Sequence, residues 1–304
     1  MNDVRKAAEI LRGGGLVAFP TETVYGLGAD ATNDLAVARI YEAKGRPQFN
    51  PLIAHVGEVE AALALAEFPA AALALAARFW PGPLTLVLPR KAGCPVSLLA
   101  SAGLPSIALR VPQHALALEL IREAGRPIVA PSANPSGRIS PTTAAHVREG
   151  LGTKADLVLD GGPCAVGLES TIVSLHDDTP RLLRTGGLAR DKIEQVLGRK
   201  LQAALAGPLH APGQLESHYA PHARLRLNAT DWRVGEAQLG FGAVDAPLNL
   251  SRKGDVVEAA GNLFSMLHQL DAAGSSIIAV APIPAIGLGE AINDRLRRAA
   301  APRE

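Results

Sequence analysis

The sequence predicts an α/β protein of two parts, and three features of its 304 residues support this class. Short apolar runs bounded by Pro or Gly, which are typical of strands, alternate with segments in which apolar residues recur at helical spacing. Between 157 and 185 the strand-like runs follow one another without a helix, which favours a mixed sheet. A segment rich in Pro and Gly at 201–222 separates a larger part from a smaller one.

The first part begins with a helix. Apolar residues from Val4 to Leu11 recur at helical spacing, Asn2 or Asp3 caps the start, and the glycines at 13–15 end it. Strand-like runs follow at 16–19, 51–56, 84–89, 106–112, 126–132, 156–162, 170–175 and 181–187. The helical patterns that separate or follow them lie at 34–43, 58–79, 114–124, 142–150 and 189–197. We expect a first domain at 1–200, a twisted sheet with flanking helices.

The second part is shorter and has the same alternation. Strand-like runs lie at 223–227, 237–241, 247–250 and 276–280. Helical patterns lie at 255–273 and 288–300. This order predicts a small Rossmann-like α/β domain at 223–304, joined to the first domain by the linker at 201–222.

Charge and composition exclude several classes of protein. The formal net charge of +1 gives no overall basic field for nucleic acid. Cys94 and Cys164 are isolated, which argues against a disulfide framework or a thiolate metal site and fits a reducing compartment. The polar N-terminus lacks the apolar run of a secretory signal, and no segment is apolar enough for a membrane span. We therefore expect a soluble, cytoplasmic protein without membrane contact.

Two glycine-containing stretches could bind a ligand. "FPTETVYGLGADA" at 19–31 reads as a loop between strand and helix, either an ordinary connection or a site for a small polar ligand. Its end, "GLGADA", nearly fits a dinucleotide fingerprint but lacks the expected acidic residue further on. "GLGEA" at 287–291 could hold an anion, although a tight turn is favoured, and no P-loop sequence is present.

Polar residues stand at the ends of the predicted strands and helices of the first part. Lys44 and Arg46 follow a helix, where cations could merely complement its dipole, and Arg110 and Arg184 end strands. Hydroxyl-rich stretches end two further strands, "PSANPSGRIS" and "GLEST". Four cations with clustered hydroxyls and no set of metal ligands predict a pocket for phosphate plus carboxylate.

These stretches together identify a family. In chain order the sequence resembles the YrdC-like family in the strings "PTETVYGLG", "KGRPQFNPL", "WPGPLTLVL", "ALRVPQH", "APSANPSG", "ESTI" and "LLRTGG". The linker "APGQLESHYAP" followed by a small domain resembles the long, two-domain form of that family. The linker departs from the family pattern at "GQLES", where a Met and a basic residue are frequent.

The resemblance implies an enzyme, a nucleotidyltransferase. It implies that L-threonine, bicarbonate or CO2 and ATP give L-threonylcarbamoyl-AMP and pyrophosphate, the first step of t6A modification of tRNA. Mg²⁺ bound through the ATP phosphates is the expected cofactor, with no metal site from the protein alone. The expected partners are a transferase that receives the product and modifies tRNA, and tRNA itself in a weak contact.

The resemblance also implies roles for individual residues. Those matched to the threonine site are Thr23, His55, Arg110, Ala130 and Ser170. Those matched to the ATP site are Arg46, Asn50, Ser106, Ser132, Ser140, Arg184 and His218. Lys44 and Arg46 are the expected catalytic pair, and the linker is expected to act as a lid that brings His218, with Tyr219 beside it, over the substrates.

Three alternatives remain open at this point. A hydrogenase-maturation carbamoyltransferase has a similar domain but adds paired-cysteine zinc motifs, which this sequence lacks. A non-enzymatic RNA-binding module is the alternative from another class, although the near-neutral charge and the lack of interleaved Arg and aromatic residues count against it. His210, His218 and His222 could form a metal site, but a polar linker is favoured.

Overall fold

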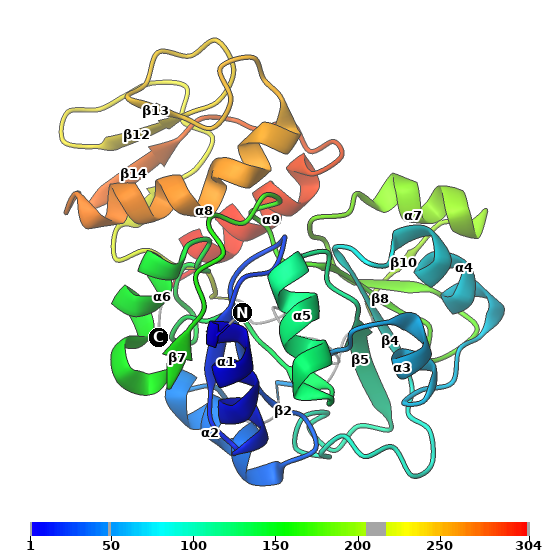
Figure 1. Cartoon of the computed structure of the whole chain (residues 1–304). Coiled ribbons are helices and arrows are strands. Elements are labelled where there is room, and N and C mark those ends of the chain that lie inside the picture. The colour runs from blue at the N-terminus through cyan, green and yellow to red at the C-terminus, as the bar shows by residue number, and fades with distance from the viewer. Residues whose placement is uncertain (1, 48–49, 205–216, 303–304) are drawn as a thin grey trace.

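The computed structural model describes residues 2–47, 50–204 and 217–302, and it contains two sheets. Figure 1 shows the smaller, C-terminal unit resting on one end of the larger, N-terminal unit. In the described part of the chain, no helix combines the length and apolar character that crossing a membrane requires.

The sheet of the first unit is mixed, as predicted. Its strands, in spatial order, are β10 (Gln202–Ala203), β9 (Arg181–Arg184), β8 (Thr171–Ser174), β4 (Leu84–Pro89), β5 (Ser106–Arg110), β3 (Ile53–His55), β6 (Ile128–Val129), β2 (Gly26–Asp30), β1 (Val17–Phe19) and β7 (Leu157–Val158). The pairs β10/β9, β8/β4, β5/β3 and β1/β7 are parallel, and the other neighbours are antiparallel. Because β10 belongs to this sheet, the linker predicted from residue 201 starts inside the first unit.

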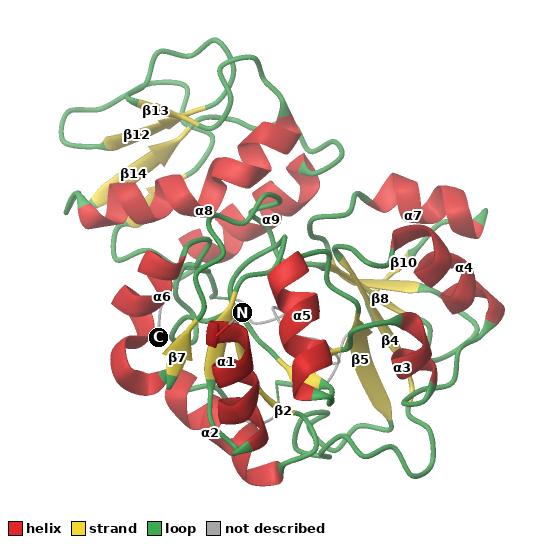
Figure 2. Ribbon diagram, in the orientation of Figure 1, coloured by secondary structure: helices red, strands yellow, loops and turns green. Residues whose placement is uncertain are grey.

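Helices flank this sheet, as Figure 2 shows. They are α1 (Asn2–Arg12), α2 (Asp34–Lys44), α3 (Val59–Leu63), α4 (Ala70–Phe79), α5 (Ala115–Ala124), α6 (Ala144–Leu151) and α7 (Arg190–Leu197), with a 3₁₀ turn at Gly152–Lys154. α1 packs against α5, and α4 packs against α7. The apolar face of α1 that the spacing predicts is buried with residues of α5 and β1 in one cluster.

The second unit has a parallel sheet, as its Rossmann-like pattern predicts. Its strands, in spatial order, are β11 (Arg224–Arg226), β14 (Ile277–Val280), β12 (Ala237–Gly240) and β13 (Leu248–Asn249). α8 (Val256–Ala272) and α9 (Gly289–Ala300) lie between this sheet and the first unit (Figure 1). Gly287, with φ of +53°, forms the tight turn predicted for "GLGEA". α9 then begins at Gly289, where a Cβ would lie 1.9 Å from the carbonyl oxygen of Pro284.

The two units share an apolar core at their contact. Val24, Ile139 and Leu168 of the first unit are buried in the same cluster as the apolar residues of α8 and α9. Gly167 lies at this contact with φ of +72°, and a Cβ there would lie 2.5 Å from the carbonyl oxygen of Ala260 on α8. Only glycine fits this position, so the backbone of the first unit meets α8 directly.

Three sequence predictions are corrected by the fold. Residues 26–30, expected within a loop, form β2, where Gly28 leaves room for Phe19: a Cβ would lie 2.7 Å from its ring. The helix expected at 58–79 is two helices, because Pro69 cannot continue a helix and the intervening chain pairs with the end of β4. The strand expected at 156–162 is only the two residues of β7, beside β1.

Candidate active site

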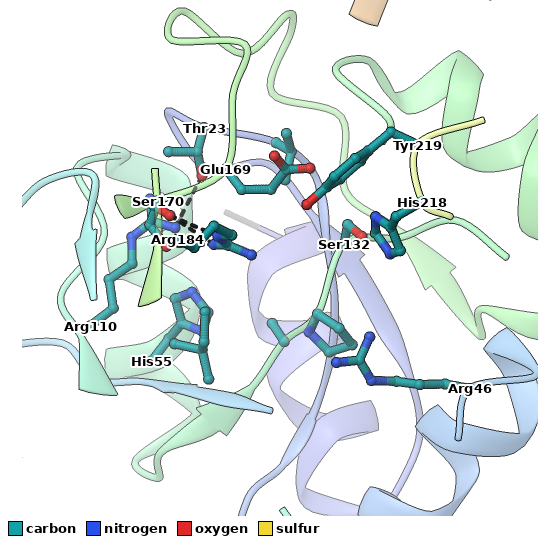
Figure 3. Close-up of a pocket in the computed structure, with 14 residues that line it drawn as sticks. Thr23, Arg46, His55, Arg110, Ser132, Glu169, Ser170, Arg184, His218 and Tyr219 are labelled. Carbon is teal, nitrogen blue, oxygen red and sulfur yellow. Dashed lines mark hydrogen bonds between the residues drawn. The ribbon is translucent and has the colours of Figure 1, made fainter. Parts of the chain in front are cut away.

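A cavity opens where strand ends and loops of the first unit meet His218 and Tyr219 of the linker. Figure 3 shows Thr23, Ser170, Arg110 and His55 on one side of it, and Ser132, His218, Tyr219 and Arg46 on the other. Glu169 and Arg184 lie between these two groups. The cavity is lined by three arginines and one carboxylate, so its electrostatic character favours an anionic ligand.

Arg110 is fixed from three directions at the end of β5. One terminal nitrogen lies 2.6 Å from Glu22 Oε1, the other donates to Thr23 Oγ1 at 3.0 Å, and Nε donates to the carbonyl of Gly82 at 3.2 Å. Glu22 and Arg110 are both buried, so the pair is shielded from solvent. A guanidinium held in this way presents its remaining N–H donors in one direction only.

The "TETV" stretch forms a turn that presents Thr23. Thr21 Oγ1 accepts hydrogen bonds from the backbone N–H groups of Thr23 and Val24, both at 3.2 Å. This hydroxyl-capped turn directs the Thr23 side chain toward Arg110, while Glu22 lies behind the guanidinium. The sequence left two interpretations of this stretch, an ordinary connection or a ligand site. The turn lies on the cavity wall, as the second interpretation requires.

His55 is a neutral imidazole in this wall. Burial, with the positive charge of Arg110 nearby, lowers the pKa of His55 to about 3. Its Nδ1 is buried and has no hydrogen-bond partner in the described part of the protein. A buried polar atom without a partner is costly, which is consistent with a ligand completing the site.

Ser170 and Arg184 form one unit of the cavity floor. Arg184 donates through Nε and one terminal nitrogen to the carbonyl of Ser170, at 3.0 and 2.8 Å, and to Ser170 Oγ at 3.1 Å. Ser170 Oγ is also 2.7 Å from Thr85 Oγ1 on β4. Burial, with the positive charges of Arg295 and Arg110 nearby, lowers the pKa of Arg184 below its usual value.

Arg46 lies in the cavity wall just after the end of α2. Asn33 caps the start of that helix through its side chain, and Gly45 ends it at φ of +59°. Arg46 then donates to the carbonyls of Asn50 and Pro51, at 3.2 and 3.1 Å. The amide group of Asn50 is buried without a partner among the described residues, although Asn50 is not itself on the cavity wall.

Lys44 lies behind the cavity rather than in its wall. Its ammonium donates to the carbonyl of Ser132 at 2.6 Å and to that of Asn134. Burial, together with the charge of Arg46, lowers the pKa of Lys44 well below its usual value. In this structure Lys44 therefore supports the 132–134 loop, and only Arg46 of the predicted catalytic pair reaches the cavity.

The remaining predicted residues occupy different positions. Ala130 and Ser132 are on the cavity wall. Ser106 lies on the same face of β5 as Arg110, at the far end of the strand and beyond the wall. Ser140 is buried behind Glu169 and donates its hydroxyl to Oε1 of that carboxylate.

The described end of the linker fills one side of the cavity. His218 and Tyr219 are buried, their rings are 4.0 Å apart, and the Tyr219 hydroxyl points into the cavity (Figure 3). Burial and four nearby cations lower the pKa of His218 well below its usual value, so the ring is neutral. His218 Nδ1 and the Tyr219 hydroxyl have no partner among the described residues. Most of the predicted lid, 205–216, lies outside the described residues.

Glu169 lines the cavity, although the sequence prediction assigned it no role. Arg295 Nε donates to Glu169 Oε2 at 2.9 Å. Burial by itself raises the pKa of the Glu169 carboxyl, but the charges of Arg295 and Arg184 and the hydrogen bonds that it accepts lower it. Glu22 was likewise given no role. Each acid stands beside a residue that the motifs did assign: Glu22 beside Thr23, and Glu169 beside Ser170.

The three-histidine interpretation of the linker has no support in the described residues. His210 lies outside them, and His222 pairs with Asp271 at 2.9 Å, on α8. Within the described ranges, no group of three or more His, Cys, Asp or Glu could hold a metal ion.

Comparison with known families decides the relationship. The family model Sua5_yciO_yrdC, described as "Telomere recombination", matches residues 9–186. The chain belongs to this family. A second model, "Threonylcarbamoyl-AMP synthase, C-terminal domain", matches residues 188–301, so the family's two-domain arrangement extends over the small unit.

Relatives within the family match almost the whole chain. A threonylcarbamoyl-AMP synthase of Pyrococcus abyssi is 43% identical over 97% of this chain and 93% of its own. One of Bacillus subtilis is 41% identical over 99% and 93%. The crystal structure of P. abyssi Sua5 complexed with L-threonine superposes with a TM-score of 0.88, at 40% identity, over 98% of this chain and 94% of that one.

Proposed function

We propose that the protein is an L-threonylcarbamoyl-AMP synthase, a nucleotidyltransferase that acts in tRNA modification. It makes its product from L-threonine, bicarbonate or CO2, and ATP, and it releases pyrophosphate. One observation supports this most directly: the cavity gathers Arg46, Arg110 and Arg184 around unpartnered polar atoms. Near-full-length relatives with this name, and the threonine complex of P. abyssi Sua5, support the choice of substrate.

Threonine is assigned to the side of the cavity near Arg110. The free donors of Arg110 suit the threonine carboxylate, and the hydroxyls of Thr23 and Ser170 suit its small polar groups. His55 contributes a hydrogen-bonding group there rather than a charge, because its pKa of about 3 keeps the ring neutral.

ATP is assigned to the opposite side. Arg46 and Arg184 suit the phosphates, Ser132 provides a hydroxyl, and His218 provides a neutral ring nitrogen. The amine of threonine takes up CO2 as a carbamate, and a carbamate oxygen then attacks the α-phosphorus as pyrophosphate leaves. The reaction needs no protein nucleophile, so the protein's task is to orient two anions and to neutralise developing charge.

In this proposal Mg²⁺ binds together with ATP, through the phosphates. Among the described residues the single carboxylate of the cavity wall, Glu169, is already engaged by Arg295 and Ser140, so the wall offers no ligand set. An ion that keeps several waters and binds chiefly to substrate phosphates fits such a site.

Further partners belong to the same proposal. A mixed anhydride decomposes in water, so we expect hand-off to a transferase that modifies tRNA in the cytoplasm, with at most a weak contact to tRNA itself. The alternative, a non-enzymatic RNA-binding module, does not account for a buried cavity with three arginines and unpartnered polar atoms.

The deciding experiment measures pyrophosphate release from ATP with and without threonine and bicarbonate. We expect release to need both, and kcat/KM to fall in the order threonine, serine, valine. A site that bonds a hydroxyl discriminates against its absence by at least about 100-fold, more than it does against a missing methyl. Equal rates with valine would contradict the assignment of Thr23 and Ser170, and threonine-independent release would contradict the function.

A further inference from the structure

Arg295, on α9 of the small unit, contacts two residues that line the cavity, Glu169 and Tyr219. Its side chain is only 1% exposed, and each nitrogen of its guanidinium has an acceptor. Nε donates to Glu169 at 2.9 Å, one terminal nitrogen donates to the carbonyl of Thr185 at 2.8 Å, and the other donates to Asp294 at 2.8 Å. One side chain therefore joins α9 to two segments that flank the candidate active site.

The flat face of the same guanidinium contacts the linker. Its central carbon lies 5.0 Å from the centre of the Tyr219 ring, within the range of a cation–π interaction. Phe264 of α8 stacks on Tyr219, with ring centres 5.7 Å apart. Tyr219 has φ of +64°, a left-handed conformation that is unfavourable for a residue with a Cβ, so these contacts hold it in place.

Stability alone is a weak explanation for this arginine. A buried ion pair often contributes little net stability, because desolvation of both charges offsets their attraction. Its geometry, in contrast, has a consequence for the site: fixing Tyr219 also fixes His218, whose backbone N–H donates to the carbonyl of Arg298 one turn further along α9. α9 thus holds the linker by both its backbone and a buried side chain.

We propose that Arg295 is a positioning residue through which the small unit completes the ATP side of the site. It orients the Glu169 carboxylate and clamps the Tyr219 ring, so that the His218 ring faces the phosphate-binding arginines. This proposal rests on the proposed function in assigning ATP to that side of the cavity. The contacts of Arg295 with Glu169 and Tyr219 do not depend on that function.

The test compares three full-length variants with the wild type. Arg295→Met removes the charge and keeps much of the volume, and Arg295→Lys keeps the charge but loses the planar fork. Arg297→Met is the matched control, because Arg297 lies on the same helix with its side chain 71% exposed. The measurements are the KM for ATP and kcat at saturating threonine, threonine affinity by calorimetry, and hydrogen exchange of the peptide at 217–223.

We expect Arg295→Met to raise the KM for ATP at least about tenfold while threonine affinity changes by less than about threefold. Exchange at 217–223 should become faster, Arg295→Lys should show an intermediate defect, and Arg297→Met should match the wild type. An unchanged KM for ATP and unchanged exchange in a folded Arg295→Met protein would overturn the proposal. Equal losses of threonine and ATP binding would do so too.

A fourth variant covers the case in which Arg295→Met does not fold. Tyr219→Leu leaves the Arg295–Glu169 pair in place and removes the ring that Arg295 clamps, so it should raise the KM for ATP with threonine affinity retained. A normal KM for ATP would again overturn the proposal. If the wild type releases no pyrophosphate with threonine, the proposed function fails, and the exchange at 217–223 still decides whether Arg295 holds the linker.

Discussion

His55 links the protonation of one buried ring to the stability of the protein. Its pKa is about 3 when folded and 6.5 in the ordinary case, because burial and Arg110 disfavour the charged ring. Between these values the unfolded chain binds the additional proton, so stability rises with pH across the window and is lost as pH falls from 6.5 toward 3. This residue accounts for a slope of up to about 1.4 kcal/mol per pH unit.

The first prediction is that His55→Gln flattens that dependence. The free energy of unfolding, measured with urea at pH 4, 5, 6 and 7, should vary less with pH in the variant than in the wild type. His176→Gln, at an exposed histidine, serves as control and should keep the wild-type slope. Identical slopes in all three proteins would mean that His55 is not buried as a neutral ring.

Arg46 and Arg184 give the second prediction. Replacing either with Ala should raise the KM for ATP at least about tenfold, since each removes a charge-assisted contact to phosphate. The control is Arg39→Ala, on α2, whose arginine pairs with Asp156 at the surface. Circular dichroism should show intact secondary structure in both variants. Normal turnover of both at limiting ATP would mean that the phosphates do not bind at Arg46 and Arg184.

At the scale of an element, the end of the linker acts as a wall of the site. His218→Ala removes a ring nitrogen that has no partner among the described residues and that faces the ATP side. We predict at least about a tenfold loss of product formation at limiting ATP, with threonine affinity retained. His222→Ala, at the linker histidine that pairs with Asp271, is the control and should keep most activity. Full activity of His218→Ala would mean that the linker only connects the two units and does not contribute His218 to the site.

At the scale of the whole molecule, the small unit contributes to the site rather than sitting apart from it. A chain cut near Ala206 loses His218, Tyr219 and Arg295 together, and it uncovers Val24, Ile139 and Leu168. We predict that it still binds threonine through Arg110 and Thr23 but forms little threonylcarbamoyl-AMP. Product formation, threonine calorimetry and circular dichroism on the cut and full-length chains test this, and full synthetic activity of the folded, cut chain would refute it.

The amino-acid sequence was enough to predict the class of fold, the mixed sheet and the set of cations and hydroxyls at element ends. Local patterns carry this information, because helical spacing, strand-like runs and the residues that end them are read within short windows. The family strings added the expected roles, and most of the matched side chains do converge on one cavity. The errors were local too: β2 was missed because its glycines look like a loop until Phe19 packs on them.

The pairing of charges, in contrast, depends on the folded chain and could not be predicted from local patterns. Three contacts join residues that are far apart in the chain. Glu22 pairs with Arg110, Lys44 donates to the 132–134 loop, and Arg295 pairs with Glu169 across the two units. Such pairs leave no periodic signal, since each side chain satisfies a partner that folding alone brings near. The same burial makes His55 and His218 neutral, because a ring's protonation depends on the charges packed around it.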